Sequence, residues 1–162
     1  MRIGLIADTH GLLAGDALEA LAACEHIIHS GDVGRGVIQA LAAIAPVTAV
    51  RGNNDASGEE ALLPRLARLE LEGSSIAVVH RLVDEPHGGH DILVFGHCHR
   101  RHAYFEGDRL YVNPGAAGRR GFHRDRSVAL LDLVAGAEPR ITFVELTPRA
   151  SLGAMLAGSQ RA

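Results

Sequence analysis

Side chains that commonly bind metals recur in this sequence in loops that follow short apolar segments. Histidine is frequent, with ten among 162 residues, and imidazole is both the commonest metal ligand in proteins and a proton carrier near neutral pH. Hard oxygen donors mixed with imidazoles suit two neighbouring divalent cations that clamp a phosphate. The candidate ligands in such loops are Asp8, His10, Asp32, Asn53, His80, His97 and His99. These residue types predict a metal site, provided that the fold brings the loops together.

The segments that must position these residues alternate between strand and helix in the first third of the chain. β-Branched and aliphatic runs predict strands, alanine- and leucine-rich stretches with helical spacing predict helices, and Pro46 ends the second helix. The expected order is a strand at 2–7, a helix at 16–23, a strand at 27–28, a helix at 37–44 and a strand at 47–50. This order implies parallel strands with right-handed crossovers. Ligands bind beyond the carboxyl ends of strands in open α/β sheets, so we expect the loops to meet at one rim.

The second half of the chain is richer in hairpins. Short turn segments separate apolar runs at Glu72-Gly73, Gly107-Asp108 and Ala135-Gly136, which predicts antiparallel strand pairs. The expected strands are 66–71 with 75–79, a single strand at 91–95, 103–106 with 110–112, and 127–134 with 141–146. We expect one domain over residues 1–147, followed by a tail at 148–162 that is either frayed or one short docked helix.

Composition excludes several classes of function. Hydrophobic residues make up 47% and charged residues 22% of the chain, as in ordinary globular proteins. All 16 basic residues are arginine, which excludes a Schiff-base lysine and a Walker A phosphate loop. The formal net charge of −3 does not support general nucleic-acid binding, and the apolar runs are too short to span a membrane. Two cysteines do not make a disulfide scaffold, and the first residues do not resemble a signal peptide, so we expect a cytoplasmic protein.

Five short motifs carry the candidate residues, and their order is informative. Asp-x-His and Gly-Asp are each expected by chance in a chain of this composition, whereas Gly-His-x-His is rarer. The motifs run Asp8-Thr9-His10, Gly31-Asp32, Gly52-Asn53-Asn54-Asp55, His80 and Gly96-His97-Cys98-His99. In this order they resemble the signature of the calcineurin-like metallophosphoesterases. The small size, the form of the third motif and a later Asn113-Pro114-Gly115 are similar to the small phosphodiesterase branch, which includes the retromer scaffold subunit.

The resemblance implies a fold, a cofactor and a reaction. The fold would be a four-layer α/β/β/α sandwich with two mixed sheets. Two divalent metal ions, of manganese, nickel, iron or zinc, would lie at the rim, and metal-bound hydroxide would attack the phosphorus of a small phosphoester substrate in line. By motif, one metal takes Asp8, His10, Asp32 and His99, and the other takes Asp32, Asn53, His80 and His97. Asp32 would then bridge the two metals, and Asp32 and Asn53 are the candidate catalytic residues.

Simpler interpretations of the same residues stay open. Asp8 could cap a following helix, and Asp32 and Asn53 could be ordinary turn residues in glycine-containing loops. His80 is the weakest match, because the family usually continues with glycine where this chain has Arg81. In an extended Gly-His-x-His segment both histidines point to one side, so we expect Cys98 to pack on the other side and not to bind metal.

Two further residues, Asn54 and Arg100, are assigned to substrate binding. Asn54 stands where many members of the superfamily have a general-acid histidine, and an amide cannot donate a proton at neutral pH. Asp55, His87 or His90 could supply that proton instead. Arg100 could pair bidentately with phosphate oxygens, although solvated surface charge explains an isolated arginine better.

The predicted activity is phosphodiester hydrolysis, and two alternatives remain. A scaffold could keep the fold and lose catalysis, as the resemblance to the retromer subunit allows, although a pure scaffold would not need imidazoles at positions 10, 97 and 99. A dinucleoside polyphosphate hydrolase or protein phosphatase of the same superfamily fits less well, because the short chain leaves little room for substrate-recognition insertions. The natural substrate, the native metal and any homo-oligomeric assembly are left open.

Overall fold

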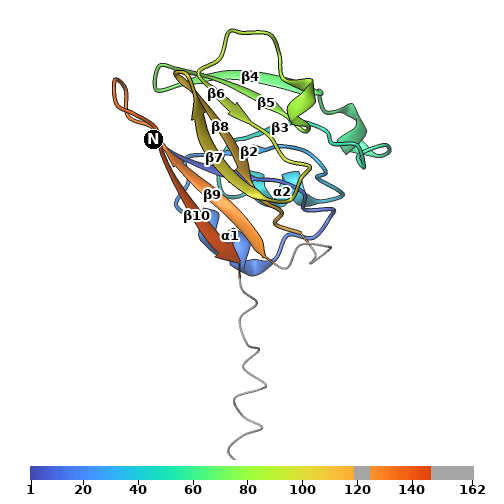
Figure 1. Ribbon diagram of the computed structural model, residues 1–162. Coiled ribbons are helices and arrows are strands. Elements are labelled where there is room, and N and C mark those ends of the chain that lie inside the picture. The colour runs from blue at the N-terminus through green and yellow to red at the C-terminus, as the bar shows by residue number, and fades with distance from the viewer. Residues whose placement is uncertain (119–124, 147–162) are drawn as a thin grey trace, which may run out of the picture.

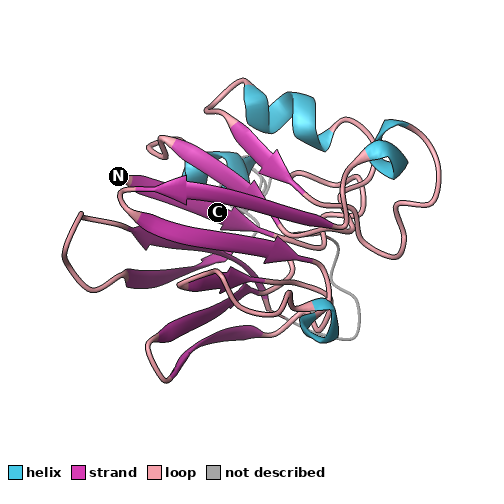
Figure 2. Cartoon of the chain, turned by 90° about the horizontal axis from the view of Figure 1, so that it is seen from above, coloured by secondary structure: helices cyan, strands magenta, loops and turns pink. Residues whose placement is uncertain are grey.

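Two five-stranded sheets, here called sheet A and sheet B, stack face to face in the computed structural model (Figure 1 and Figure 2). The structure describes residues 1–118 and 125–146. The tail predicted at 148–162 lies outside the described residues, and its two alternatives stay predictions.

Sheet A contains the three parallel strands expected from the first third of the chain. Its order is β10-β9-β1-β2-β3, in which β1, β2 and β3 are parallel and β9 is antiparallel to both β1 and β10. The register places Leu5 opposite Ile28 on one side and Ala129 on the other. The strands span Arg2–Ile6 (β1), His26–His29 (β2), Val47–Ala49 (β3), Arg126–Asp132 (β9) and Arg140–Leu146 (β10). Because β1 is the central strand, the loop that follows it lies in the middle of the sheet's edge.

Two short helices, α1 (Gly15–Leu21) and α2 (Val37–Ala42), cover the outer face of sheet A. In each helix two buried residues four positions apart face the sheet, which is the spacing of one helix face. The buried pairs are Ala17 with Leu21 and Val37 with Leu41. Neither helix has a side-chain N-cap, and both are shorter than an isolated helix needs, so packing on the sheet stabilises them. Among the described residues, no helix is long and apolar enough to cross a membrane.

Sheet B has the order β4-β5-β6-β8-β7. Its three central strands β5, β6 and β8 are parallel, and β4 and β7 are antiparallel strands at its two edges. The strands span Leu66–Leu71 (β4), Ser74–Val79 (β5), Ile92–Val94 (β6), Arg101–Glu106 (β7) and Arg109–Pro114 (β8). The parallel strands again send their carboxyl ends to one edge of the sheet.

The main hydrophobic core lies between the two sheets. Leu5 and Ile28 of sheet A pack in one buried cluster with Ile76, Val94 and Leu110 of sheet B. Burying a large aliphatic side chain contributes about 1.5–3 kcal/mol, so this interface fixes how the sheets are stacked. Their two sets of strand ends are thereby held next to each other.

The outer face of sheet B carries a smaller buried cluster with a different cover. Its members are Ala77, Val79, Leu93, Phe95 and Tyr111. The segment 81–91 crosses this face and contains the 3-10 turn η2 (Leu82–Asp84). Glu85 anchors the segment, since its Oε1 accepts hydrogen bonds from Nη1 of Arg109 at 3.0 Å and from the Tyr111 hydroxyl at 2.9 Å. A second 3-10 turn, η1 (Glu59–Leu62), precedes β4.

The predicted fold class is confirmed, because two mixed sheets pack face to face with helices outside sheet A. The element boundaries differ in detail. Both helices end two residues earlier than expected, and Ile44 N–H already bonds to Leu41 O, as in a tighter last turn. The strand expected at 127–134 ends at Asp132, and Val134 is 64% exposed. The Glu72-Gly73 turn is present, with a positive φ at both residues, as a two-residue hairpin requires.

Gly4 of β1 lies directly under α1. A Cβ atom at this position would be 2.5 Å from Cδ2 of Leu21 and 3.1 Å from Sγ of Cys24. Gly4→Val should therefore lower the free energy of unfolding by about 1–3 kcal/mol, measured by urea denaturation. Gly15→Ala is the matched control, because nothing lies within 4 Å of its Cβ, and it should leave stability unchanged or raise it by up to about 1 kcal/mol. Wild-type stability in Gly4→Val would show that α1 packs less closely on β1.

Candidate metal centre

The seven candidate ligands lie at one edge of the stacked sheets. Each follows the carboxyl end of a strand, with two after β1, one each after β2, β3 and β5, and two after β6. Backbone hydrogen bonds join these loops: Asp8 N–H donates to Gly31 O at 3.0 Å, and Gly96 N–H donates to His80 O at 2.9 Å. The structure therefore brings the five loops together, and the ligand roles themselves stay predictions.

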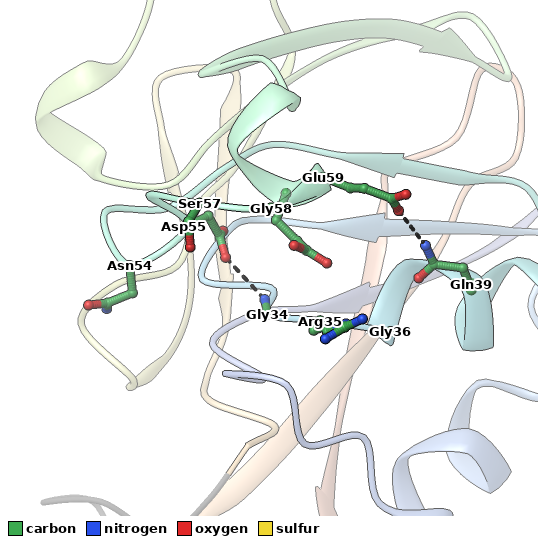
Figure 3. Close-up of a pocket in the computed structure, with 10 residues that line it drawn as sticks. Gly34, Arg35, Gly36, Gln39, Asn54, Asp55, Ser57, Gly58 and Glu59 are labelled. Carbon is green, nitrogen blue, oxygen red and sulfur yellow. Dashed lines mark hydrogen bonds between the residues drawn. The ribbon is translucent and has the colours of Figure 1, made fainter.

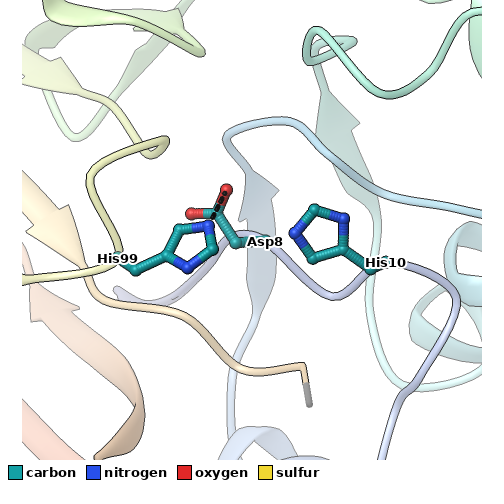
Figure 4. A group of neighbouring side chains, drawn as sticks. All are labelled: Asp8, His10 and His99. Carbon is teal, nitrogen blue, oxygen red and sulfur yellow. Dashed lines mark ion pairs between the residues drawn. The ribbon is translucent and has the colours of Figure 1, made fainter. Parts of the chain in front are cut away.

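A first cluster contains three of the candidates (Figure 4). One ligand atom from each of Asp8, His10 and His99 lies within 4.8 Å of the others. Nε2 of His99 is 3.3 Å from Oδ1 of Asp8. That oxygen is buried, and no hydrogen bond satisfies it among the described residues, which is costly for a carboxylate. Both imidazoles are partly exposed, so a cation from solvent can reach this oxygen.

A second cluster is fully buried. Its members are Asp8, Asp32 and His80. Nε2 of His80 is 3.5 Å from Oδ2 of Asp32 and 3.1 Å from Oδ1 of Asn53. Nδ1 of His80 contacts the carbonyl of Ser30 at 2.9 Å, and an N–H at Nδ1 leaves Nε2 to face the site. The His97 ring lies beside this cluster, with its centroid 5.1 Å from that of His80. His80, the weakest match to the family motifs, thus lies beside the other candidate ligands.

Asp32 lies between the two clusters. Its Oδ2 is 3.5 Å from Nε2 of His80 and 3.9 Å from Nε2 of His10. Asn54 donates to the same carboxylate twice, from its backbone N–H to Oδ1 at 2.8 Å and from its side-chain amide to Oδ2 at 2.6 Å. One carboxylate oxygen therefore faces histidines of both predicted metal sets, as a bridging ligand requires. Asn54, which we assigned to substrate, contacts Asp32 in this structure.

Among the described residues, no arginine forms an ion pair with the two carboxylates of the centre. Asp8 and Asp32 are buried, and their ion-pair partners among the described residues are histidines. Burial opposes ionisation of Asp32, but hydrogen bonds from His80 and Asn54 outweigh it and hold its pKa well below the usual value. The Asp8 carboxylate, 3.3 Å from Nε2 of His99, raises the pKa of that imidazole. Burial opposes charge on His80 as well, yet Asp32 prevails and raises its pKa. These carboxylates attract positive charge, and the donor set fits divalent cations.

Backbone conformation marks the same residues. Six described residues other than glycine have a positive φ, and such a conformation costs about 1–3 kcal/mol. One is Glu72, in the turn between β4 and β5. The other five are Asp8, His10, Asp32, His97 and His99, with φ between 48° and 69°. Strain of this kind persists where the surrounding structure imposes it, and it clusters at functional sites.

The Gly-His-x-His segment is not extended, so the prediction about its side chains rested on the wrong conformation. φ is 69° at His97 and 57° at His99, and alternation of side chains does not apply. His97 lies against His80, whereas His99 pairs with Asp8, so the two imidazoles reach different clusters. Cys98 was expected to pack, and this was wrong, because it is exposed.

The Asn113-Pro114-Gly115 motif fixes this segment from β8. The amide of Asn113 donates to Gly96 O at 2.7 Å, and its Oδ1 accepts the N–H of Gly115 at 2.9 Å. Gly115 has a φ of 83°, and a Cβ there would collide with Oγ of Ser127, so the turn requires glycine. The motif thus positions the loop that carries two candidate ligands.

Asp55 joins the loops that follow β2 and β3. Its carboxylate is buried and accepts three backbone N–H groups, from Val33 at 3.0 Å, Gly52 at 2.8 Å and Gly34 at 3.0 Å. Figure 3 shows the hydrogen bond from Gly34. These bonds direct both oxygens at the backbone and away from the centre. The geometry therefore argues against the proton-donor role considered for Asp55 and indicates a structural one.

His29 and Thr9 form a second buried link, whose importance the sequence analysis missed. Nδ1 of His29 accepts the N–H of Gly31 at 3.2 Å, so Nε2 carries the proton and donates to Oγ1 of Thr9 at 2.9 Å. That hydroxyl donates in turn to Val33 O at 2.6 Å. The available signal was the position of His29, since a polar side chain that ends a buried strand must find partners.

Two hollows adjoin the second cluster, and a larger cavity lies farther along the edge. The cavity of about 680 Å³ is lined by none of the seven candidates (Figure 3). A polar hollow of about 390 Å³ includes Asn53 and His80 in its lining, and an apolar groove of about 430 Å³ includes His97. Arg100 is exposed and lines neither of them, so its substrate role stays a prediction.

Burial of His29 makes stability depend on pH. Burial lowers the pKa of its imidazole from 6.5 to about 3, so between these values the unfolded chain binds a proton that the folded chain does not. Stability is then lost as the pH falls, by up to about 1.4 kcal/mol per pH unit. His29→Gln should unfold at lower urea at pH 7.5 and show a shallower loss between pH 6 and 4, measured with EDTA present. His87→Gln, at an exposed histidine, is the control, and equal slopes for wild type and His29→Gln would contradict the assignment.

Comparisons with known proteins show the family of the chain. Residues 1–136 match the model of the calcineurin-like phosphoesterase superfamily domain. The chain is 30% identical over 135 residues to a probable metallophosphoesterase of Methanothermobacter thermautotrophicus, covering 72% of this chain and 77% of that protein. An archaeal phosphodiesterase structure is 25% identical with a TM-score of 0.70, over 89% of this chain and 100% of the other. A single mutant of Vps29 from Entamoeba histolytica is 19% identical with a TM-score of 0.72, over 91% and 100%. The chain therefore belongs to the calcineurin-like phosphoesterase superfamily, and its neighbours fit the small phosphodiesterase branch.

Proposed function

We propose that this chain is a dinuclear metal-dependent phosphodiesterase. The observation that carries the proposal is the burial of Asp8 and Asp32 with histidines as their ion-pair partners among the described residues. Such a centre has negative charge to hold cations and an open side where His10 and His97 are exposed. The similarity to an archaeal phosphodiesterase supports a diester as the substrate class.

The proposed ligands divide into two sets that share Asp32. One set is Asp8, His10, Asp32 and His99, and the other is Asp32, Asn53, His80 and His97. The mixed oxygen and imidazole donors suit manganese, nickel, iron or zinc. When bound, the cations supply positive charge to the phosphate and lower the pKa of the attacking water.

The protein's own groups orient the ligands and the substrate. Ser30 O fixes the ring of His80 through Nδ1, so Nε2 is presented to the centre. The polar hollow beside Asn53 contains Arg51 and Arg65, whose positive charge favours an anionic diester. Arg81 also lines it but is paired with Asp84. Asn54 and Arg100 remain the proposed substrate contacts, as hydrogen-bond donors to phosphate oxygens.

A non-catalytic scaffold is the second candidate, favoured by the fold similarity to Vps29. A scaffold needs the sheets and the loops but has no use for imidazoles that face buried carboxylates. Three histidines, His10, His80 and His99, have a ring nitrogen within 4 Å of an oxygen of Asp8, Asp32 or Asn53. The ring of a fourth, His97, contacts the ring of His80. Retention of these side chains supports catalysis over scaffolding alone.

Metal analysis followed by a substrate panel tests the proposal directly. Protein purified without chelator and then supplied with manganese should hold two ions per chain and hydrolyse diesters faster than monoesters. Failure to bind metal would contradict the proposed centre. Two bound ions with no hydrolysis of any ester would favour the scaffold.

Asp32→Ala should be more damaging than any other single ligand change, because both ions lose an anchor. We expect loss of both metals and a fall in kcat/KM of more than about 100-fold, since loss of groups that merely orient ligands already costs 10–100-fold. His10→Ala should keep one metal. His26→Ala, at the opposite end of β2, is the control and should keep both. Elemental analysis measures the metals, and two metals with normal turnover in Asp32→Ala would make the bridging assignment wrong.

Because position 54 is an asparagine, we expect kcat/KM to depend strongly on the leaving group. Without a proton donor at this position, kcat/KM for a series of aryl diesters should fall steeply as the leaving-group pKa rises, because general acid catalysis is worth about 10² to 10⁴ in rate. Asn54→His should flatten this slope and gain most on alkyl esters. Because Asn54 also holds Asp32, metal content is measured in parallel, with Asn54→Gln as the control. A shallow slope in the unmodified protein, with chemistry rate-limiting, would show that another acid is already in place.

A further inference from the structure

An apolar groove of about 430 Å³ lies on the outer face of sheet B, next to the metal centre. One wall comes from η2 and the other from the edge strand β7. The residues that define it are Leu82, Val83, Phe95, His97, His102 and Tyr104. Three of these apolar side chains are open to solvent, with exposed fractions of 39% for Leu82, 84% for Val83 and 41% for Tyr104. Large apolar side chains gathered around a concave surface indicate a ligand site.

The aromatic wall of the groove is held in a fixed orientation. The ring of Tyr104 stacks on that of Tyr111, with centroids 5.0 Å apart and planes 5° from parallel. Tyr111 is buried and donates its hydroxyl to Oε1 of Glu85 at 2.9 Å. Tyr104 therefore presents a flat aromatic surface that needs little ordering when a ligand binds.

The groove is continuous with the proposed metal centre. Gly96, His97 and Cys98 form part of its lining, and the His97 ring contacts the His80 ring at 5.1 Å between centroids. Arg81, the residue after His80, also lines the groove, but its guanidinium is engaged by Asp84 at 2.9 and 3.0 Å. An ester group on a phosphate bound at the centre would thus extend into an apolar groove. The one arginine in the lining of this groove, Arg81, is already paired with Asp84.

We propose that this groove binds a flat apolar group, such as an aryl ring or a base, that is esterified to the phosphate of the substrate. The inference rests on the proposed phosphodiesterase function and adds the substrate class to it. The size of the groove matches a small ligand, whereas a stable protein interface buries about 1,200 Å² or more in total. The stacking surface of Tyr104 suits a planar group better than an alkyl chain.

Binding of phosphonates tests the groove without turnover. In the manganese-loaded protein, 4-fluorobenzylphosphonate should bind at least about tenfold more tightly than methylphosphonate, as measured by ¹⁹F line broadening and by competitive inhibition. Tyr104→Ala and Val83→Asn should each reduce this aryl preference, by about tenfold for Tyr104→Ala given the usual contribution of aromatic stacking. Methylphosphonate binding should not change in either variant.

Phe105→Ala is the matched control for the groove variants. Phe105 is the next residue on β7, is 47% exposed and does not line the groove. Because Val83 is almost fully exposed, Val83→Asn does not endanger folding. With bis(4-nitrophenyl) phosphate, kcat/KM should fall about tenfold in Tyr104→Ala and stay within twofold in Phe105→Ala.

The outcomes separate the two proposals. If diesters are hydrolysed and methylphosphonate inhibits, but the aryl preference is absent or is lost equally in Phe105→Ala, the groove inference is overturned and the proposed function stands. If no diester is hydrolysed and neither phosphonate binds, the proposed function fails and the inference fails with it.

Discussion

Two carboxylates buried at the ends of parallel strands set the conditions for the rest of this structure. Ionised carboxylates in a protein interior are costly unless they are paired and hydrogen-bonded. Asp32 receives two hydrogen bonds from Asn54, and Oδ2 of Asp8 receives the N–H of His97 at 3.1 Å. Oδ1 of Asp8 has no such donor among the described residues. The described residues therefore stabilise these groups in part, and the remaining negative charge favours a bound cation.

Holding ligands from five loops around this charge demands a rigid frame. The left-handed conformations at five of the candidate ligands are unfavourable by themselves, so neighbouring contacts must impose them. Three buried polar side chains do this from outside the centre. Asp55 ties the loops after β2 and β3, His29 links β2 to the loop after β1 through Thr9, and Asn113 holds the loop after β6. Their polar atoms contact backbone groups, the Thr9 hydroxyl and the Cys98 sulfur, and none of them occupies a candidate ligand position.

Local sequence patterns predicted some of the strands and the meeting of the loops, but they did not predict the strand pairing of sheet B or the backbone conformation of the loops. The strand-helix alternation of the first third predicted the parallel strands of sheet A, and the ordered motifs predicted which loops meet. Parallel pairing of β5, β6 and β8 depends on contacts distant in sequence, which periodicity does not contain. His97 and His99 both have a positive φ, and the His97 N–H is held by Asp8 from a distant loop, so an argument from an extended backbone placed Cys98 wrongly. His29 and Asp55 act through backbone groups, and no motif of side-chain types reveals such partners.

The departure from the family pattern at Arg81 has a structural counterpart. The residue that made His80 the weakest match lies just before η2 and lines both the polar hollow and the apolar groove. Its bidentate pairing with Asp84 directs the guanidinium along this boundary. Because His80 is fixed independently, by Ser30 and by burial in the second cluster, a side chain at position 81 can vary without moving the proposed ligand. The proposed metal centre and the surfaces beside it are thus separable in this fold. Under the proposed function, a different side chain at position 81 would alter substrate selection before it altered metal binding.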